Sequence, residues 1–196
     1  MEIKKISVLL ALPFLLLLCE WIYFDRVYHE KPGVARGADM ILVYSGSDDR
    51  IQALSGLIQP KNNPVFLFSG WDYAKSNLEK RVKLDPSLIQ VEDRARTTDQ
   101  NARYSAPMIL QRKVHNILLA LPWYQLPRAL FLTRFYLAGS GVSVEPYASI
   151  PLPDRWWKSS LFGLEMVKFW GSLFRVSLAW LGVEDWPKHE WGLSRS

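Results

Sequence analysis

The sequence contains little cysteine and histidine and has no strong excess of charge. Cys19 is the one cysteine among 196 residues, which excludes an intrachain disulfide framework and a cysteine-rich metal site. The three histidines, His29, His115 and His189, are far apart and form no ligand-spaced pair, so we expect no metal site. The 24 Lys and Arg against 19 Asp and Glu leave a net charge of only +5, spread along the chain. Nucleic acid is therefore not an expected partner.

Aromatic residues, by contrast, are abundant. Nine Trp, eight Tyr and nine Phe make up 13% of the chain, while apolar residues make up 49% and charged residues 22%. These proportions are globular and exclude wholesale disorder and fibrous repeats. Six of the nine tryptophans lie between Trp156 and Trp191. Tryptophan at this level is typical of large apolar contacts or of a membrane–water interface.

The longest apolar stretch lies near the N-terminus. It runs for 19 residues from Ile6 to Phe24 and contains only Ser7, Pro13 and Glu20 as exceptions. A helix of ~20 apolar residues spans a bilayer. Glu20 lies near the far end of the run, where its carboxylate would reach the interface. The sequence therefore predicts an N-terminal transmembrane helix, with residues 1–27 as the membrane anchor and 28–37 as a polar linker.

The charges around this segment predict its orientation. Lys4 and Lys5 precede the run, so the positive-inside rule places the N-terminus in the cytoplasm and the rest of the chain outside. A cleaved signal peptide is less favoured because the segment lacks small residues near a cleavage site. The run is also compatible, though less well, with a lipoprotein cut before Cys19 or with a buried core helix.

Residues 38–150 alternate between short apolar runs and segments with helical spacing. The apolar runs, which we expect to be strands, are 40–44, 65–68, 87–91, 116–121 and 142–145. The helical segments are 48–59, 72–83, 98–112 and 127–138. Strands that alternate with helices of this length form βαβ units. The pattern predicts an α/β fold: a Rossmann-like three-layer sandwich with a mostly parallel five-stranded sheet, the first strand being central.

Residues 151–196 form a distinct Trp-rich extension, because Pro151 and Pro153 break the alternation. The pattern of residues 156–183 predicts one long helix or two helices. The charged residues of this segment are Lys158, Glu165, Lys168 and Arg175. On a helix they fall within about 100° of one another, which leaves a wide apolar face. This C-terminal amphipathic helix either packs on the domain or lies in the membrane interface. A second span would have to bury four charges and is disfavoured.

Polar residues follow the carboxyl ends of the predicted strands, where open α/β sheets bind ligands. They are Gly46 and Arg50 after the first strand, Ser69 and Gly70 after the second, Glu92, Thr98 and Asn101 after the third, and Gln125 and Arg128 after the fourth. Arginine with small polar residues suits a phosphate or another anion. A purely structural role is also open for two of them, with Thr97 or Thr98 as a helix cap and Arg128 in an ion pair. Trp71 and Trp123 fall in the same loops and are expected to line the mouth of the crevice.

Four of these loop motifs resemble the SanA/YdcF/ElyC-like proteins of the bacterial envelope. The motifs are Ala38–Gly46 with Arg50 and Ile51, Phe68–Gly70, Glu92 with Thr98–Ala102, and Tyr124–Ala129. The resemblance covers about residues 38–147, with order and spacing kept. It implies a Rossmann-like fold, an N-terminal membrane anchor and a role in envelope integrity and in peptidoglycan or lipid-carrier metabolism. It also implies a site of Gly46, Arg50, Ser69, Gly70, Glu92, Thr98, Asn101 and Arg128.

The sequence departs from this family pattern at four places. Ser45–Ser47 replaces a longer glycine run, Trp71 replaces a glycine and Ala95 replaces a serine. Gln125 stands where the family has a histidine, and glutamine cannot replace histidine in acid–base chemistry. Ligand binding can survive such a change where catalysis does not.

The function expected from the sequence is therefore that of an envelope protein anchored in the bacterial inner membrane, with its body on the periplasmic side. Its strand-end crevice would bind a phosphorylated small molecule or lipid, with Glu92 as the catalytic candidate. The sequence identifies no cofactor, and whether a reaction occurs stays open. A non-catalytic scaffold or regulator of an envelope complex is the second expectation.

Overall fold

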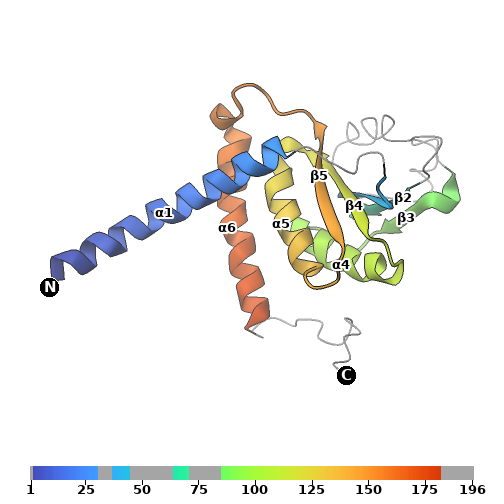
Figure 1. Ribbon diagram of the computed structural model, residues 1–196, viewed down its shortest axis with the longest axis horizontal. Coiled ribbons are helices and arrows are strands. Elements are labelled where there is room, and N and C mark those ends of the chain that lie inside the picture. Colours follow the sequence, from blue (N-terminus) through green and yellow to red (C-terminus); the bar gives the residue numbers. More distant parts are fainter. Residues whose placement is uncertain (1, 31–36, 45–63, 71–84, 182–196) are drawn as a thin grey trace.

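The described part of the chain centres on a five-stranded sheet. The computed structural model describes residues 2–30, 37–44, 64–70 and 85–181, with the side chains of 2–11 and 179–180 outside this description. The strands are β1 (Met40–Tyr44), β2 (Val65–Ser69), β3 (Ile89–Glu92), β4 (Asn116–Pro122) and β5 (Ser143–Ile150). They lie in the order β3-β2-β1-β4-β5, and all neighbouring pairs are parallel (Figure 1). The predicted α/β class and the central first strand are confirmed.

The central strand β1 is buried on both sides. Met40, Leu42 and Tyr44 face one hydrophobic cluster, while Ile41 and Val43 face another. All five side chains are at most 2% exposed. This burial explains why the strand is continuously apolar rather than alternating, as is typical of parallel sheets.

Two helices, α4 (Thr98–Gln111) and α5 (Leu126–Tyr136), cover one face of the sheet. Ala102, Ala106 and Ile109 of α4 pack in the same cluster as Leu130 of α5 and the β1 side chains on that face. The opposite face carries the second cluster. The two helices predicted at 48–59 and 72–83 lie outside the described residues, so the three-layer arrangement is shown for one face of the sheet.

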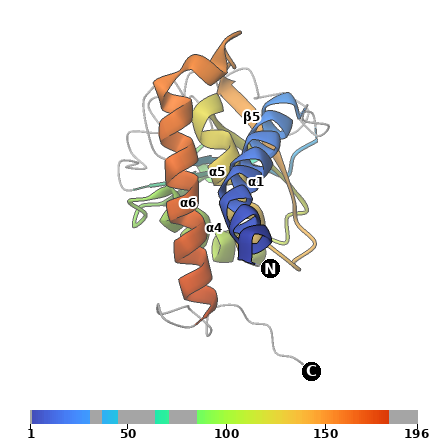
Figure 2. The ribbon, with the colours of Figure 1, turned by 90° about the vertical axis from the view of Figure 1, so that its left-hand side faces the viewer.

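An outer layer is formed by the first and last helices, which pack on α5 rather than on the sheet (Figures 1 and 2). These are α1 (Glu2–His29) and α6 (Ser160–Trp180). An aromatic cluster holds this layer together; its buried members are Phe24, Trp123, Trp156, Phe162 and Phe169. Trp123 is only 5% exposed within this cluster, so the expectation that it lines the mouth of a crevice is wrong. Trp71 lies outside the described residues.

Several element boundaries differ from the sequence-based predictions. Helix α1 continues through His29, so the helix takes the first two residues of the predicted linker. Ser87 and Leu88 belong to the 3-10 helix η2 (Pro86–Leu88) rather than to a strand, because the Asp85 carboxylate accepts a hydrogen bond from the Ser87 N–H. The fifth strand runs on to Ile150; it tolerates Pro146 because it lies at the sheet edge.

The C-terminal extension also folds differently from one continuous helix. It begins with the 3-10 helix η4 (Trp156–Lys158), and α6 starts only at Ser160. One face of α6 packs on the domain, as one of the two interpretations predicted. Glu165, a member of the predicted polar stripe, lies on that buried face and is 2% exposed.

The N-terminal half of α1 extends away from the body (Figure 1). Its large side chains are exposed on all sides; Leu12, Phe14, Leu15, Leu16, Leu17 and Leu18 are 41–75% exposed. Its C-terminal half is instead part of the core, since Phe24 and Val27 are at most 3% exposed. Among the described residues, no helix has both the length and the apolar character needed to cross a membrane.

Candidate functional site

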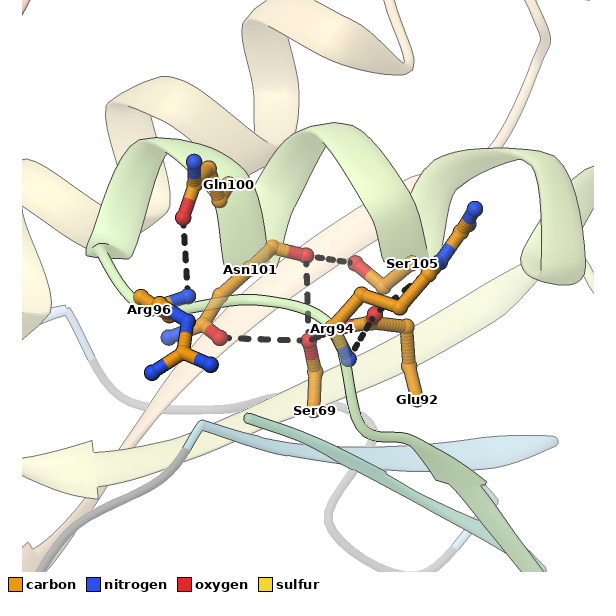
Figure 3. Close-up of polar contacts among 7 residues, drawn as sticks. All are labelled: Ser69, Glu92, Arg94, Arg96, Gln100, Asn101 and Ser105. Atoms are coloured by element: carbon orange, nitrogen blue, oxygen red, sulfur yellow. Dashed lines mark hydrogen bonds and ion pairs between the residues drawn. The ribbon is translucent and has the colours of Figure 1, made fainter. Parts of the chain in front are cut away.

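The carboxyl ends of β2 and β3 bring Ser69 and Glu92 together. The two residues are in register across the parallel pair, and the Ser69 hydroxyl donates a hydrogen bond to Glu92 Oε2 at 2.8 Å (Figure 3). The Gly70 N–H donates to the Glu92 carbonyl at 2.7 Å, which continues the ladder past the strand end. Gly70 has a φ of 140°, a conformation that favours glycine. The strand pairing therefore fixes this end of the sheet and positions both side chains.

Both oxygens of the Glu92 carboxylate are held. Oε2 accepts from Ser69, and Oε1 accepts from the Arg94 N–H at 2.8 Å. The Arg94 guanidinium lies farther away, with Nε 3.7 Å from Oε1. Glu92 is 4% exposed, and a buried carboxylate requires such partners to offset its lost hydration. The result is a carboxylate in a fixed position, which is what a proton acceptor needs.

Helix α4 brings Asn101 to the same place. The Ser69 hydroxyl lies 3.3 Å from Asn101 Oδ1 and 3.4 Å from the Asn101 carbonyl oxygen. A hydroxyl has a single proton, so the shorter bond to Glu92 is the main one and the two contacts to Asn101 are weaker. The Asn101 carbonyl also accepts from the Ser105 hydroxyl at 2.6 Å. Ser69, Glu92, Asn101 and Ser105, with at most 4% exposure each, form what we call the strand-end cluster.

Local capping determines where α4 begins. The Thr97 hydroxyl accepts a hydrogen bond from the Gln100 N–H, and Gln100 Oε1 accepts from the Arg96 N–H at 2.8 Å. This reciprocal arrangement resembles a capping box. Thr97, rather than Thr98, is therefore the N-cap. Thr98 is the first residue of the helix, and its predicted contact with a ligand stays a prediction.

Arg128 forms an ion pair with α6. It follows Pro127 in the first turn of α5, and its Nε donates to Glu165 Oε2 at 2.7 Å. The Lys168 ammonium lies 2.9 Å from the other oxygen of Glu165. Arg128 is 8% exposed. Of the two roles expected for this arginine, the structure therefore shows the ion pair.

The remaining predicted site residues are distributed as follows. Gln125 is half-buried at the end of the 3-10 helix η3 (Trp123–Gln125), directly before α5. Gly46 and Arg50 lie outside the described residues. The structure thus brings together Ser69, Gly70, Glu92 and Asn101, and it places Arg128 in a separate contact.

Sequence reasoning missed two hydroxyl contacts near the strand-end cluster, one buried and one partly buried. The Tyr44 hydroxyl lies 2.6 Å from Thr133 Oγ1, and the Tyr136 hydroxyl donates to Asp99 Oδ1 at 2.9 Å. Burial raises the pKa of Tyr44 well above its ordinary range. Two signals could have found the missed residues: Tyr44 is the last residue of the central strand, and Ser105 lies one helical turn after Asn101.

The exposed residues next to the cluster include two arginines and one aspartate, Asp93. Arg94 and Arg96 are exposed and leave the cluster in different directions (Figure 3), and the Arg94 guanidinium lies 4.9 Å from the centre of the Tyr104 ring. The nearby N-terminus of α4 adds a partial positive charge. Within the described ranges, no three His, Cys, Asp or Glu side chains gather as metal ligands. The site therefore offers a fixed carboxylate and polar groups beside cations that suit an anion.

Comparison with known proteins yields no family model, no curated protein and no solved structure that matches this chain. The likeness of the loop motifs to the SanA/YdcF/ElyC-like proteins thus stays a prediction from the sequence. The chain is characterised by its parallel α/β sheet and by the strand-end cluster.

Proposed function

We propose that this protein is anchored in the bacterial inner membrane, with its body on the extracytoplasmic side, and binds a phosphorylated ligand at the carboxyl edge of its sheet. The observation that carries the proposal is the convergence of Ser69, Glu92 and Asn101 beside the N-terminus of α4. Parallel α/β sheets bind ligands at this edge, and helix N-termini favour anions. In this proposal, Arg50 and the exposed Arg94 and Arg96 supply the countercharge.

The fixed carboxylate assigns a second role to the site. Glu92 would repel a phosphate placed directly against it, so it faces a water or hydroxyl of the ligand rather than the phosphate. From there it accepts a proton, while Ser69 keeps it oriented. This step needs no histidine and is therefore compatible with Gln125. Ligands of this class include a polyprenyl phosphate, as the resemblance to the envelope family implies.

The anchor is proposed on the sequence and on the exposure of α1. The apolar run extends from Ile6 to Phe24, and the side chains that the structure describes begin at Leu12, within this run. From Leu12 to Leu18 the large side chains are exposed around the whole helix, which is unfavourable in water and suits a hydrocarbon environment.

Binding can be tested with the full-length chain in detergent micelles. We expect pyrophosphate and farnesyl phosphate to raise the melting temperature, and farnesol to have no effect because it lacks the phosphate. Arg50→Ala and Asn101→Ala should lose this shift, while Arg155→Ala, a change in an exposed turn, should keep it. A melting temperature that no phosphorylated probe changes, or a shift that survives in both site variants, would refute the proposal.

The ion pair of Arg128 favours a second candidate, a non-catalytic scaffold or regulator of an envelope complex. Arg128 is held in an ion pair by Glu165, and Gln125 stands where the family has a histidine. Under this candidate, neither side chain does ligand chemistry. Under this candidate, Ser69→Ala and Asn101→Ala variants would complement a deletion strain as well as the unaltered protein does. Under the ligand-binding proposal, both variants would fail.

A further inference from the structure

The outer face of α6 is apolar and exposed, although the helix already buries an opposite face. The side chains that pack on the body are Phe162, Glu165, Phe169, Ser172 and Val176, which recur at helical spacing. On the other side, Leu164, Val167, Phe174 and Leu181 are 49%, 71%, 65% and 66% exposed. Contiguous apolar surface of this kind marks an interaction site.

This outer face lies on the side of the body from which α1 projects. Figure 1 shows α6 at the edge of the body next to the projecting α1, with the sheet on the far side. Figure 2 shows the molecule from that edge. Helix α6 lies in front of the body, α1 points toward the viewer, and the axis of α6 runs across the axis of α1. A flat surface that α1 enters would therefore run parallel to the axis of α6 and contact α6 along its length.

Contacts between the two helices place α6 at a defined level along α1. Trp170, in the middle of α6, donates a hydrogen bond from Nε1 to Glu20 Oε2 at 2.7 Å. Trp21 packs on Trp156 and on Phe162, each with ring centroids 5.2 Å apart. Glu20 and Trp21 lie at the far end of the apolar run, where a tryptophan of an aromatic belt marks the membrane–water boundary. The middle of α6 is thus level with that boundary.

The charges on α6 match an anionic surface. Glu165 is the one acidic residue in the sequence of α6, and it is buried against Arg128 and Lys168. Lys168 and Arg175 are exposed. Exposed charge on α6 is therefore basic, a pattern typical of helices that lie on anionic bilayers.

We propose that the outer face of α6 lies in the headgroup–acyl boundary of the bilayer, parallel to its surface. The inference rests on the proposed anchor, which sets the direction of the membrane. It goes further because it assigns a second membrane contact, which is discontinuous in sequence from the first. Two contacts restrict rotation of the body about α1, so one side of the sheet domain faces the lipid.

Single-cysteine labelling of the full chain in vesicles tests this contact. Cys19→Ser provides the background, and an environment-sensitive fluorophore is attached at Val167→Cys or Phe174→Cys. Leu15→Cys reports on the anchor, and Gln111→Cys, at the exposed end of α4, is the water-exposed control. The vesicles contain phosphatidylethanolamine and phosphatidylglycerol, with a nitroxide quencher near the top of the acyl chains for positions 167, 174 and 111. A second set carries the nitroxide near the ends of the acyl chains for Leu15, which lies at the middle of the apolar run. We expect quenching at Val167 and Phe174 to exceed quenching at Gln111 at least threefold.

The outcomes separate this inference from the anchor. Quenching at positions 167 and 174 no greater than at Gln111 overturns the contact of α6, even when Leu15 is quenched. Fluorophore self-quenching that rises with the labelled fraction, without lipid quenching, shows that a second copy covers the face and also overturns it. Lipid quenching at positions 167 and 174 without quenching at Leu15 supports the contact and refutes the anchor.

Discussion

Arg128 and Glu165 form a buried ion pair with 2.7 Å between Nε and Oε2, and this pair joins α5 to α6. The two side chains are 10% and 2% exposed. Their helices are separated in sequence by β5 and by the proline-rich turn after it. The pair is embedded beside the aromatic cluster and fixes how the C-terminal helix lies on the body.

Breaking this pair on one side should strongly destabilise the fold. Glu165→Leu leaves the Arg128 guanidinium buried without its carboxylate, and such losses cost about 3–5 kcal/mol. The double variant Arg128→Met with Glu165→Leu should recover most of that free energy of unfolding, because neither charge is then left alone. Urea denaturation of the two single variants and the double variant measures the coupling. Equal losses of unfolding free energy in the single and double variants would contradict a coupling between Arg128 and Glu165.

Releasing Arg128 without removing it tests whether this arginine can take part in ligand binding. Glu165→Gln keeps the shape of the side chain and removes the charge that holds the guanidinium. If Arg128 belongs to the ligand site, the variant should bind pyrophosphate more tightly than the unaltered chain, by about tenfold for a gain of ~1.4 kcal/mol. Lys168→Gln is the matched control, since it changes charge on the same cluster but leaves the Arg128 contact. Unchanged affinity in Glu165→Gln would show that Arg128 takes no part in ligand binding.

Glu92→Gln should separate binding from chemistry. The glutamine oxygen still accepts from Ser69, while the negative charge that opposes an anion disappears, so pyrophosphate binding is kept or strengthened. Any turnover of a phosphorylated substrate should fall by a factor of about 100 or more, since glutamine accepts no proton. Asp93→Asn, at the exposed neighbouring position, should leave both quantities unchanged. Turnover that persists in Glu92→Gln would exclude Glu92 as the proton acceptor.

Asp39 should make the stability of the sheet depend on pH in acid. Its carboxylate accepts hydrogen bonds from the N–H groups of His115 and Asn116 at 2.8 and 2.9 Å, and these bonds lower the pKa of Asp39 below its ordinary value. A lowered pKa in the folded state stabilises the protein above the unfolded pKa of about 3.9, and this contribution is lost as the pH falls through the folded pKa.

Asp39→Asn should therefore lower the urea midpoint at pH 7 and have less effect near pH 3. The expected cost at pH 7 is about 1 kcal/mol, below the usual value for a hydrogen bond to a charged group because Asp39 is exposed. Asp154→Asn, a change of another exposed carboxylate, is the control. An equal cost at both pH values would show that the carboxylate charge plays no part.

The C-terminal half of α1 should be indispensable for the fold, whereas its projecting half should not. Phe24 is fully buried and contacts the rings of Phe162 and Phe169, so Phe24→Ala should cost about 3–5 kcal/mol. Leu15→Ala, at a position 55% exposed, should change the unfolding free energy by less than ~0.5 kcal/mol in detergent. An effect of Phe24→Ala as small as that of Leu15→Ala would mean that α1 is a tether and not a core element.

Most of the described sheet could be predicted from the sequence because its strands are short, β-branched and bounded by turn residues. Met40–Tyr44 was predicted to the residue, and α4 to within one residue at its C-terminal end. Residues 87–88 were predicted to be strand but form a 3-10 turn, because Asp85 caps the turn through the Ser87 N–H. A pattern of apolar residues does not reveal such a cap. The helices predicted at 48–59 and 72–83 lie outside the described residues.

The site could be predicted in part for a similar reason. Parallel strands place their carboxyl ends at one edge, so Ser69 and Glu92 were expected there and lie in register. Arg128 was expected at the same edge, but its direction depends on a partner that is 37 positions away in the sequence. No local pattern connects the two residues.

Local sequence patterns were enough to predict the α/β class, the central strand, the two apolar flanks, and the gathering of Ser69, Glu92 and Asn101 at the carboxyl edge of the sheet. Periodicity and turn chemistry act over a few residues, so they are visible in the chain order. Long-range contacts in the folded chain were needed to show that Trp123 is core, that Glu165 holds Arg128, and that the flanks meet through Glu20 and Trp170. These outcomes depend on long-range packing and on the cost of burying a charge without a partner, which no local pattern records.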